Sequence, residues 1–137
     1  MASLALVLLA GCGTVKSPTE PAPDAEGGVV FTFSQIQREI FTPTCAKSGC
    51  HDVATAQEGL VLAAGRSYAL LVGHAASEQG SLARVEPGSP ERSYLILKLR
   101  GDPSISGDRM PQDGPPYLTP EQIEGIAGWI RAGALNN

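Results

Sequence analysis

The clearest periodic pattern of apolar residues lies near the carboxyl end of the chain. Thr119 is a good N-cap residue, and the proline after it suits the first position of a helix. Ile123, Ile126, Ala127 and Ile130 then recur at the three- and four-residue spacing of one helical face. The pattern predicts a terminal helix with a buried apolar face.

Two glycines interrupt this helix. Gly125 and Gly128 each lower helix propensity by about 1 kcal/mol relative to alanine. Because glycine lets another backbone come near, we expect a second helix to approach closely at these positions.

An earlier helix is predicted to begin at Thr32 or Ser34. Each is a good N-cap and has a glutamine three positions further on, as in a capping box. Ile36 and Ile40 share one face of this helix. Pro43 is expected to end it, because the residue before a proline disfavours helical backbone.

Between these two helices the pattern is weaker. A short helix is predicted at 67–72, and a better marked one from its cap at Ser89 to a stop at Gly101. At 60–62 the apolar run is at most a short extended piece, and no alternating strand pattern is visible. We therefore expect a small all-α fold, with a single domain in residues 29–137.

Composition indicates that the core of this domain is thin. The chain has 137 residues with 5% aromatics, 16 glycines and 11 prolines, so much of it is expected in loops. A large apolar cofactor would complete such a core. The formal net charge is −4 and no run of Lys and Arg occurs, which argues against nucleic-acid binding.

The amino terminus carries an export signal. Residues 2–10 are small or apolar and too few to span a bilayer, which takes about 20 residues. The sequence Leu9-Ala10-Gly11-Cys12 resembles the lipobox of bacterial lipoproteins. That resemblance implies a signal peptide at 1–11 that is removed, and a lipid on Cys12. The alternative is an ordinary cleaved signal with an incidental cysteine.

A Pro- and Gly-rich stretch follows the lipobox. Residues 12–28 hold almost no large apolar side chain, so we expect a flexible tether between the lipid and the domain. The expected location is the bacterial cell envelope, in the periplasm or at the cell surface. Gly13, rather than aspartate, follows Cys12, which by resemblance to known sorting signals favours the outer membrane.

The main candidate site is Cys45-Ala46-Lys47-Ser48-Gly49-Cys50-His51. In Cys-x-x-Cys-His motifs two thiols bind the haem vinyl groups, and the adjacent histidine binds the iron. Here four residues separate the thiols, so both can reach one porphyrin only if the spacer bulges outward, which Gly49 makes easier. Whether both thiols are attached stays open.

A second iron ligand is available in Met110. It is the only methionine after Met1 and lies in the polar sequence Gly107-Asp108-Arg109-Met110-Pro111. A loop of this kind can wrap over the haem face opposite His51, and Met/His ligation raises the reduction potential. His74 is the other neutral nitrogen ligand.

The ordered set of features resembles a class I cytochrome c: a first helix, the Cys-Cys-His motif, a Met-Pro loop and a Trp-containing last helix. It looks most like the bacterial lipoprotein cytochromes c with a four-residue spacer, over roughly residues 30–134. The similar pieces are Arg84-Val85-Glu86-Pro87-Gly88 with Ser93-Tyr94-Leu95, Arg109-Met110-Pro111 and Gly128-Trp129-Ile130.

The resemblance implies an electron carrier rather than an enzyme. One covalent haem c would cycle between Fe(III) and Fe(II), and other redox proteins would be the donors and acceptors. The haem would be held by Cys45, Cys50, His51 and Met110. The first and last helices would cross near Gly125, Gly128 and Trp129. Candidates for contacts to the haem propionates are Arg84, Tyr94 and Arg109.

Three other interpretations remain at this point. Cys45 and Cys50 can form a disulfide in a haem-free envelope module, since exported proteins permit it. The two cysteines with His51 and His74 can bind zinc, although adjacent Cys50 and His51 reach one tetrahedral ion poorly. A peroxidase-like haem enzyme would need an open sixth position on the iron, without Met110.

Overall fold

The computed structural model describes residues 29–137. The predicted signal peptide at 1–11, the tether at 12–28 and the lipid attachment at Cys12 lie outside the described residues. Within 29–137 no helix is both long and apolar enough to cross a membrane.

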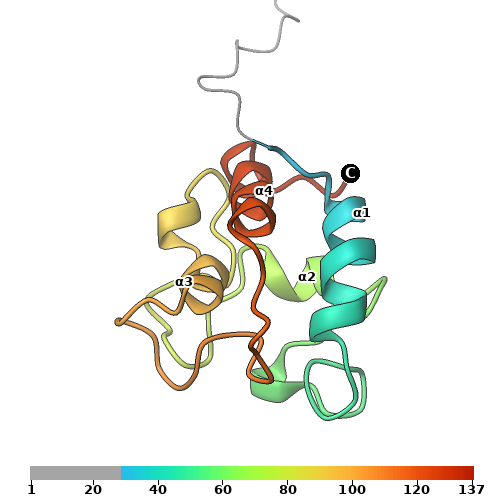
Figure 1. Cartoon of the computed structure of the whole chain (residues 1–137). Coiled ribbons are helices and arrows are strands. Elements are labelled where there is room, and N and C mark those ends of the chain that lie inside the picture. Colours follow the sequence, from blue (N-terminus) through green and yellow to red (C-terminus); the bar gives the residue numbers. More distant parts are fainter. Residues whose placement is uncertain (1–28) are drawn as a thin grey trace, which may run out of the picture.

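The described residues form short helices joined by long loops, as the sequence predicts. No strand occurs among them, only three isolated backbone bridges between loops, which confirms the all-α expectation in this coarse form. Figure 1 shows α1 and α3 on opposite sides of α4, with α2 between them and the long loops gathered at the end away from the carboxyl terminus. The helices, in order, are α1 (Phe33–Ile36), η1 (Gln37–Cys45), η2 (Gln57–Gly59), α2 (Ser67–Leu71), η3 (Pro90–Arg92), α3 (Tyr94–Arg100) and α4 (Pro120–Arg131).

The first helix begins at the predicted cap. The Thr32 hydroxyl accepts from the Gln35 amide, and the Gln35 side chain accepts from the Thr32 amide, so the capping box is complete. Phe33 and Ile36 are buried, so the face of the helix that carries them packs into the core. A local signal of two polar residues is enough to set this start.

The same helix does not end before Pro43, so that prediction is wrong. It continues to Cys45 as the π-helical segment η1, with Pro43 inside it. The Ala46 amide donates to the Phe41 carbonyl, five residues earlier, at 2.8 Å. In an α-helix the proline ring clashes with the carbonyl four residues earlier. The wider π turn separates the ring from that carbonyl, so the helix continues past Pro43.

Helix α4 has the predicted cap and buried face, but the segment next to its two glycines is not the helix that the sequence predicted. A Cβ atom on Gly125 would lie 2.5 Å from the Phe31 ring, and one on Gly128 would lie 2.8 Å from the Val29 carbonyl oxygen. The segment crossing them is therefore the extended chain before α1, rather than a helix. The Phe31 amide donates to the Gly125 carbonyl at 3.3 Å.

The predicted helix from Ser89 to Gly101 is divided in two. Between η3 and α3 the backbone of Ser93 is extended, with φ −94° and ψ 113°. Its buried hydroxyl donates to the Ser89 carbonyl and accepts from the Glu86 amide, each at 2.9 Å. These bonds stabilise the break. Gly101 ends α3 in the left-handed conformation, as predicted.

The core is built from apolar side chains of α1, η1, α3 and α4, together with loop residues such as Leu62 and Val85. Trp129 is 1% exposed, and its ring centroid lies 5.4 Å from that of Phe33. The indole nitrogen donates to the Leu135 carbonyl at 2.7 Å, which holds the carboxyl-terminal chain against the core. Trp129 is thus a core residue.

Candidate functional site

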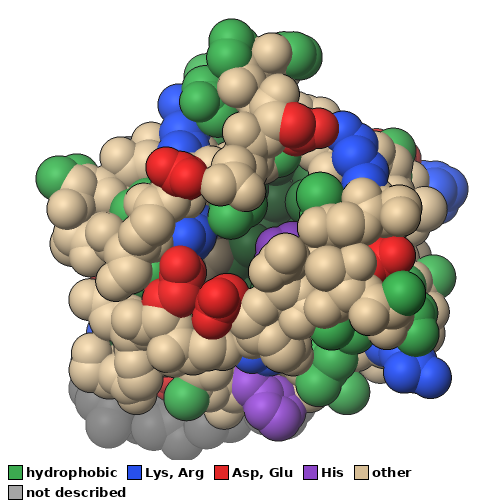
Figure 2. Space-filling view, turned by 90° about the horizontal axis from the view of Figure 1, so that it is seen from below, with side chains coloured by type: hydrophobic (Ala, Val, Ile, Leu, Met, Phe, Trp, Pro, Cys, Tyr) green, Lys and Arg blue, Asp and Glu red, His purple; other side chains and the backbone are tan. Residues whose placement is uncertain are grey.

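A cavity opens between the loops, and its lining includes the core residues Leu62, Leu71 and Leu99. Its volume is about 330 Å³, and the empty space including its open mouth is about 1380 Å³. Figure 2 looks into this hollow and shows hydrophobic side chains in its depth. Cavities of this kind are the usual binding sites for small molecules and cofactors. Four predicted site residues line it together: Cys45, Cys50, His51 and Met110.

The spacer between the cysteines, residues 46–49, bulges outward, with residues 47–49 exposed. Gly49 has φ +83°, and no atom lies within 4 Å of the position of a Cβ atom there. The Cys50 amide donates to the Lys47 carbonyl at 3.0 Å, and the His51 amide donates to the Cys45 carbonyl at 3.1 Å. The closed loop places both cysteines and the histidine at one wall of the cavity.

Both thiols at this wall are free and half-buried. Burial raises the pKa of the Cys45 thiol to about 12, so Cys45 carries its proton at neutral pH. Protonated cysteines are poor zinc ligands and poor nucleophiles.

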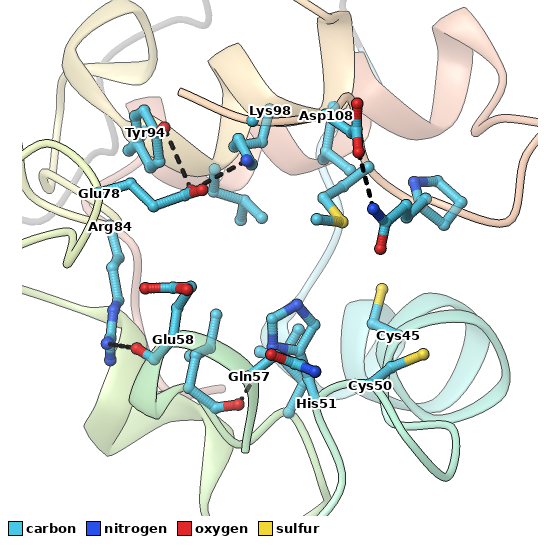
Figure 3. Close-up of a pocket in the computed structure, with 18 of the residues that line it drawn as sticks. Cys45, Cys50, His51, Gln57, Glu58, Glu78, Arg84, Tyr94, Lys98 and Asp108 are labelled. Atoms are coloured by element: carbon cyan, nitrogen blue, oxygen red, sulfur yellow. Dashed lines mark hydrogen bonds and ion pairs between the residues drawn. The ribbon is translucent and has the colours of Figure 1, made fainter. Parts of the chain in front are cut away.

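His51 points into the cavity between the cysteines and a charged cluster on the other side (Figure 3). Its Nδ1 atom lies 3.1 Å from the Leu60 carbonyl oxygen. Because a carbonyl can only accept a hydrogen bond, Nδ1 carries a proton, and in the neutral ring Nε2 then keeps its lone pair. That tautomer leaves Nε2 as a possible metal ligand.

The turn that supplies the Leu60 carbonyl is tightly wound. Ala56 and Glu58 adopt left-handed backbone, with φ of 45° and 54°, which is uncommon for residues other than glycine. The Leu62 amide donates back to the His51 carbonyl at 2.8 Å. His51 is therefore held on both its side chain and its backbone by this one turn.

Met110 reaches the cavity from the loop between α3 and α4. Its amide donates to the Lys98 carbonyl at 2.9 Å, and its side chain is half-buried against the core. The backbone bond to α3 holds the middle of this loop at the cavity wall. The sequence alone placed Met110 in a polar loop, and the structure brings it to the same cavity as His51.

A charged cluster lies across the cavity from the thiols (Figure 3). The Lys98 ammonium is 2.9 Å from a Glu78 carboxylate oxygen and donates to the Ser106 carbonyl at 2.8 Å. The Tyr94 hydroxyl donates to the same carboxylate at 3.2 Å. The Lys98 side chain is only 9% exposed, so these partners take the place of water around it.

The sequence analysis missed Glu78 and Lys98. The available signal was a lysine within the apolar run of α3, Tyr94-Leu95-Ile96-Leu97-Lys98-Leu99. A lysine on the buried face of a helix needs a partner, but the sequence does not say which carboxylate supplies it. Glu78 comes from the loop after α2, twenty residues earlier.

Two of the three residues expected near haem propionates line the cavity, namely Arg84 and Tyr94. Arg84 donates to the carbonyls of Leu70 and Glu58, at 2.8 and 2.7 Å, and so ties the cavity wall together. Arg109 does not line the cavity. It lies 4.0 Å from the Tyr117 ring centroid, and its Nε donates to a backbone carbonyl of α3.

The structure does not bring the candidate zinc ligands together. His74 is exposed and lies outside the cavity lining, while Cys45, Cys50 and His51 line it. Among residues 29–137, no three His, Cys, Asp or Glu side chains come close enough to hold a metal ion. The geometry therefore offers no support for a tetrahedral site.

Comparison of the sequence with known protein families, with curated proteins and with solved structures finds no match. The argument for function rests on the cavity and the residues that line it.

Proposed function

We propose that the domain binds one haem c covalently and works as a cytochrome c-like electron carrier with His51 and Met110 as axial ligands. One observation carries this proposal. A histidine whose Nδ1 is bonded to a backbone carbonyl lines a single apolar cavity together with two free thiols and the one methionine of residues 29–137. This set provides two groups for thioether bonds and two ligands for iron.

The cavity carries cations on the side away from the thiols, together with the carboxylates of Glu58 and Glu78, of which Glu78 is paired with Lys98. Haem carries its vinyl groups and its two carboxylates on different edges of one flat ring. The thiols of Cys45 and Cys50 lie at one side of the cavity, and the cations Arg84 and Lys98 lie away from them. A haem joined to the thiols would present its carboxylates toward these cations.

The residues have separate roles in this function. His51 is oriented by Leu60, so its Nε2 is ready to bind iron without reorganisation. Met110 supplies a soft sulfur ligand, which favours Fe(II) and so raises the reduction potential. When bound, the haem supplies the one-electron chemistry, and the apolar side chains keep water from the ring. The open mouth of the cavity leaves a ring edge within reach of redox proteins.

Co-expression with the haem c maturation system tests the proposal. The expected product is a red protein whose haem survives acid-acetone extraction and whose reduced spectrum has sharp α and β bands. Single Cys45→Ser and Cys50→Ser variants count the thioether bonds, because each missing bond shifts the α band of the pyridine haemochrome. A colourless chain with a Cys45–Cys50 disulfide would overturn the proposal.

The axial ligands are tested separately. His51→Ala is expected to abolish the low-spin spectrum, whereas His74→Ala, which changes the exposed histidine outside the cavity, leaves it intact. Met110→Ala is expected to open the iron to carbon monoxide. If carbon monoxide binds equally fast before and after this substitution, Met110 is not an iron ligand. That result would favour a peroxidase-like enzyme.

The proposal includes attachment to the bacterial envelope through a lipid on Cys12, with the domain in the periplasm or at the cell surface. The lipobox-like sequence before Cys12 supports it. Cys12→Ser is expected to release the protein from the membrane fraction, and mass spectrometry of the amino-terminal peptide should show the acyl groups. An unmodified peptide that starts elsewhere would contradict the anchor.

A further inference from the structure

One ion pair joins the cysteine spacer to the loop that carries Met110. The Lys47 ammonium lies 2.8 Å from a carboxylate oxygen of Asp113. Lys47 is in the spacer, next to the open turn at Gly49, and Asp113 follows Met110 by three residues. The pair therefore connects the wall that bears the thiols with the loop that bears the methionine.

Little else connects the tip of that loop to the spacer. Within the described residues, the other hydrogen bonds of 111–117 stay inside the same loop: Gln112 to Asp108 at 2.7 Å, and the Gly114 amide to the Pro111 carbonyl at 3.1 Å. A second cavity of about 240 Å³ borders the loop and is lined by both Lys47 and Asp113. Among residues 29–137, the contact of Lys47 with Asp113 is therefore the one hydrogen bond between the spacer and the loop tip.

We propose that Lys47 and Asp113 are positioning residues that hold the Met110 loop closed and so limit how often the methionine leaves the iron. The inference rests on the proposed haem function and deepens it. It also assigns a role to the longer spacer. Two of its four residues exceed the usual motif, and the outward bulge at Gly49 places Lys47 within reach of the facing loop.

The electrostatics of the pair agree with this role. The hydrogen bond between them raises the pKa of Lys47 and lowers that of Asp113, so both are charged at neutral pH. Their side chains are 44% and 57% exposed, so salt screens their attraction. The pair is suited to tuning the opening of a loop, because a contact of this strength does not lock it.

The test uses the haem-loaded protein and measures the rate at which imidazole displaces Met110 from ferric iron. Lys47→Gln and Asp113→Asn are each expected to raise this rate about two- to fivefold, the range that an exposed ion pair supports. The double variant should equal either single variant. The charge swap Lys47→Asp with Asp113→Lys should restore most of the original rate.

Arg131→Gln is the matched control. It breaks an ion pair with Glu124 at 3.1 Å, with exposed fractions of 58% and 43%, on α4 outside the cavity lining. It should leave the rate unchanged. Added salt should accelerate displacement in the natural chain and in the control, and much less in Lys47→Gln.

A second readout does not depend on the iron. Amide hydrogen exchange at residues 112–114 should be faster in Lys47→Gln than in Arg131→Gln. Equal exchange and equal displacement rates in these two variants would overturn the inference, while a His/Met-ligated haem in the same samples would leave the proposed function intact. A chain that acquires no haem would overturn both.

Discussion

The Nδ1 atom of His51 lies 3.1 Å from the carbonyl oxygen of Leu60, nine residues further along the chain. This bond decides which ring nitrogen is free, and it depends on a turn with two left-handed residues. The candidate iron ligand is therefore oriented by backbone, which no side-chain substitution at Leu60 can remove directly. What can be changed is the strain within the turn.

Ala56→Gly should stabilise the protein. A non-glycine residue in left-handed backbone costs about 1–2 kcal/mol, and glycine removes that cost in the folded protein. Glycine also raises the conformational entropy of the unfolded chain, which offsets part of the gain. We expect the free energy of unfolding to rise by about 0.5–1 kcal/mol in urea titrations. Ala54→Gly, at an exposed position without positive φ, is the control and should not stabilise. Equal losses in both variants would contradict the strain argument.

Lys98→Met should destabilise the protein strongly. The substitution leaves the Glu78 carboxylate without the ammonium that lies 2.9 Å away. Removing one member of a buried pair costs about 3–5 kcal/mol, and the 23% exposure of Glu78 should reduce this to about 2–3 kcal/mol. The double variant Lys98→Met with Glu78→Gln should recover at least half of the loss. Urea denaturation of the single and double variants measures it, and no recovery would mean that the pair does not act as a unit.

Gly128→Ala should destabilise the protein although alanine is the better helix former. A Cβ atom there would lie 2.8 Å from the Val29 carbonyl oxygen, which is backbone and cannot rotate away. Overpacking costs about 1–3 kcal/mol, which exceeds the gain of about 1 kcal/mol in helix propensity. Gly80→Ala has no atom within 4 Å of the new methyl group and serves as the control. A rise in melting temperature for Gly128→Ala would show that the chain before α1 moves aside.

The haem-free chain should lose stability in mild alkali because of Cys45. Its folded pKa of about 12 lies above the ordinary value of 9.0, so the unfolded chain releases the proton first. The stabilising contribution is complete below pH 9 and is lost as the pH rises through 12. Between pH 8 and pH 10 the loss should be about 1 kcal/mol relative to Cys45→Ala, measured by urea denaturation at each pH. A parallel pH dependence in the two proteins would contradict the burial of this thiol.

The starts of α1 and α4 were predictable because their signals are local. Thr32 and Thr119 each find their capping partner three residues away, so the sequence alone contains the whole interaction. Gly101 ends α3 for an equally local reason, the left-handed backbone. The motif from Cys45 to His51 could also be identified from the sequence, because residues that are neighbours in sequence are also neighbours in space.

Between the caps and the motif, the path of the chain depends on contacts between residues that a local sequence pattern does not reveal. Pro43 remains inside a helix because η1 is a wider π-helix. The predicted helix from Ser89 to Gly101 is interrupted at Ser93, whose hydroxyl bonds to the Ser89 carbonyl and the Glu86 amide. Gly125 and Gly128 did predict a close approach, but only the folded chain identified the neighbour as the extended segment before α1.

The sequence by itself determined the helical class, the helix caps, and the choice of Cys45, Cys50, His51 and Met110 as candidate residues. Only the tertiary structure decided that these four line one cavity, that Lys98 faces Glu78 and that Lys47 meets Asp113. The reason is physical. Caps and motifs are set by residues a few positions apart, whereas pairs of charges from distant loops meet only after the apolar core has fixed where those loops lie.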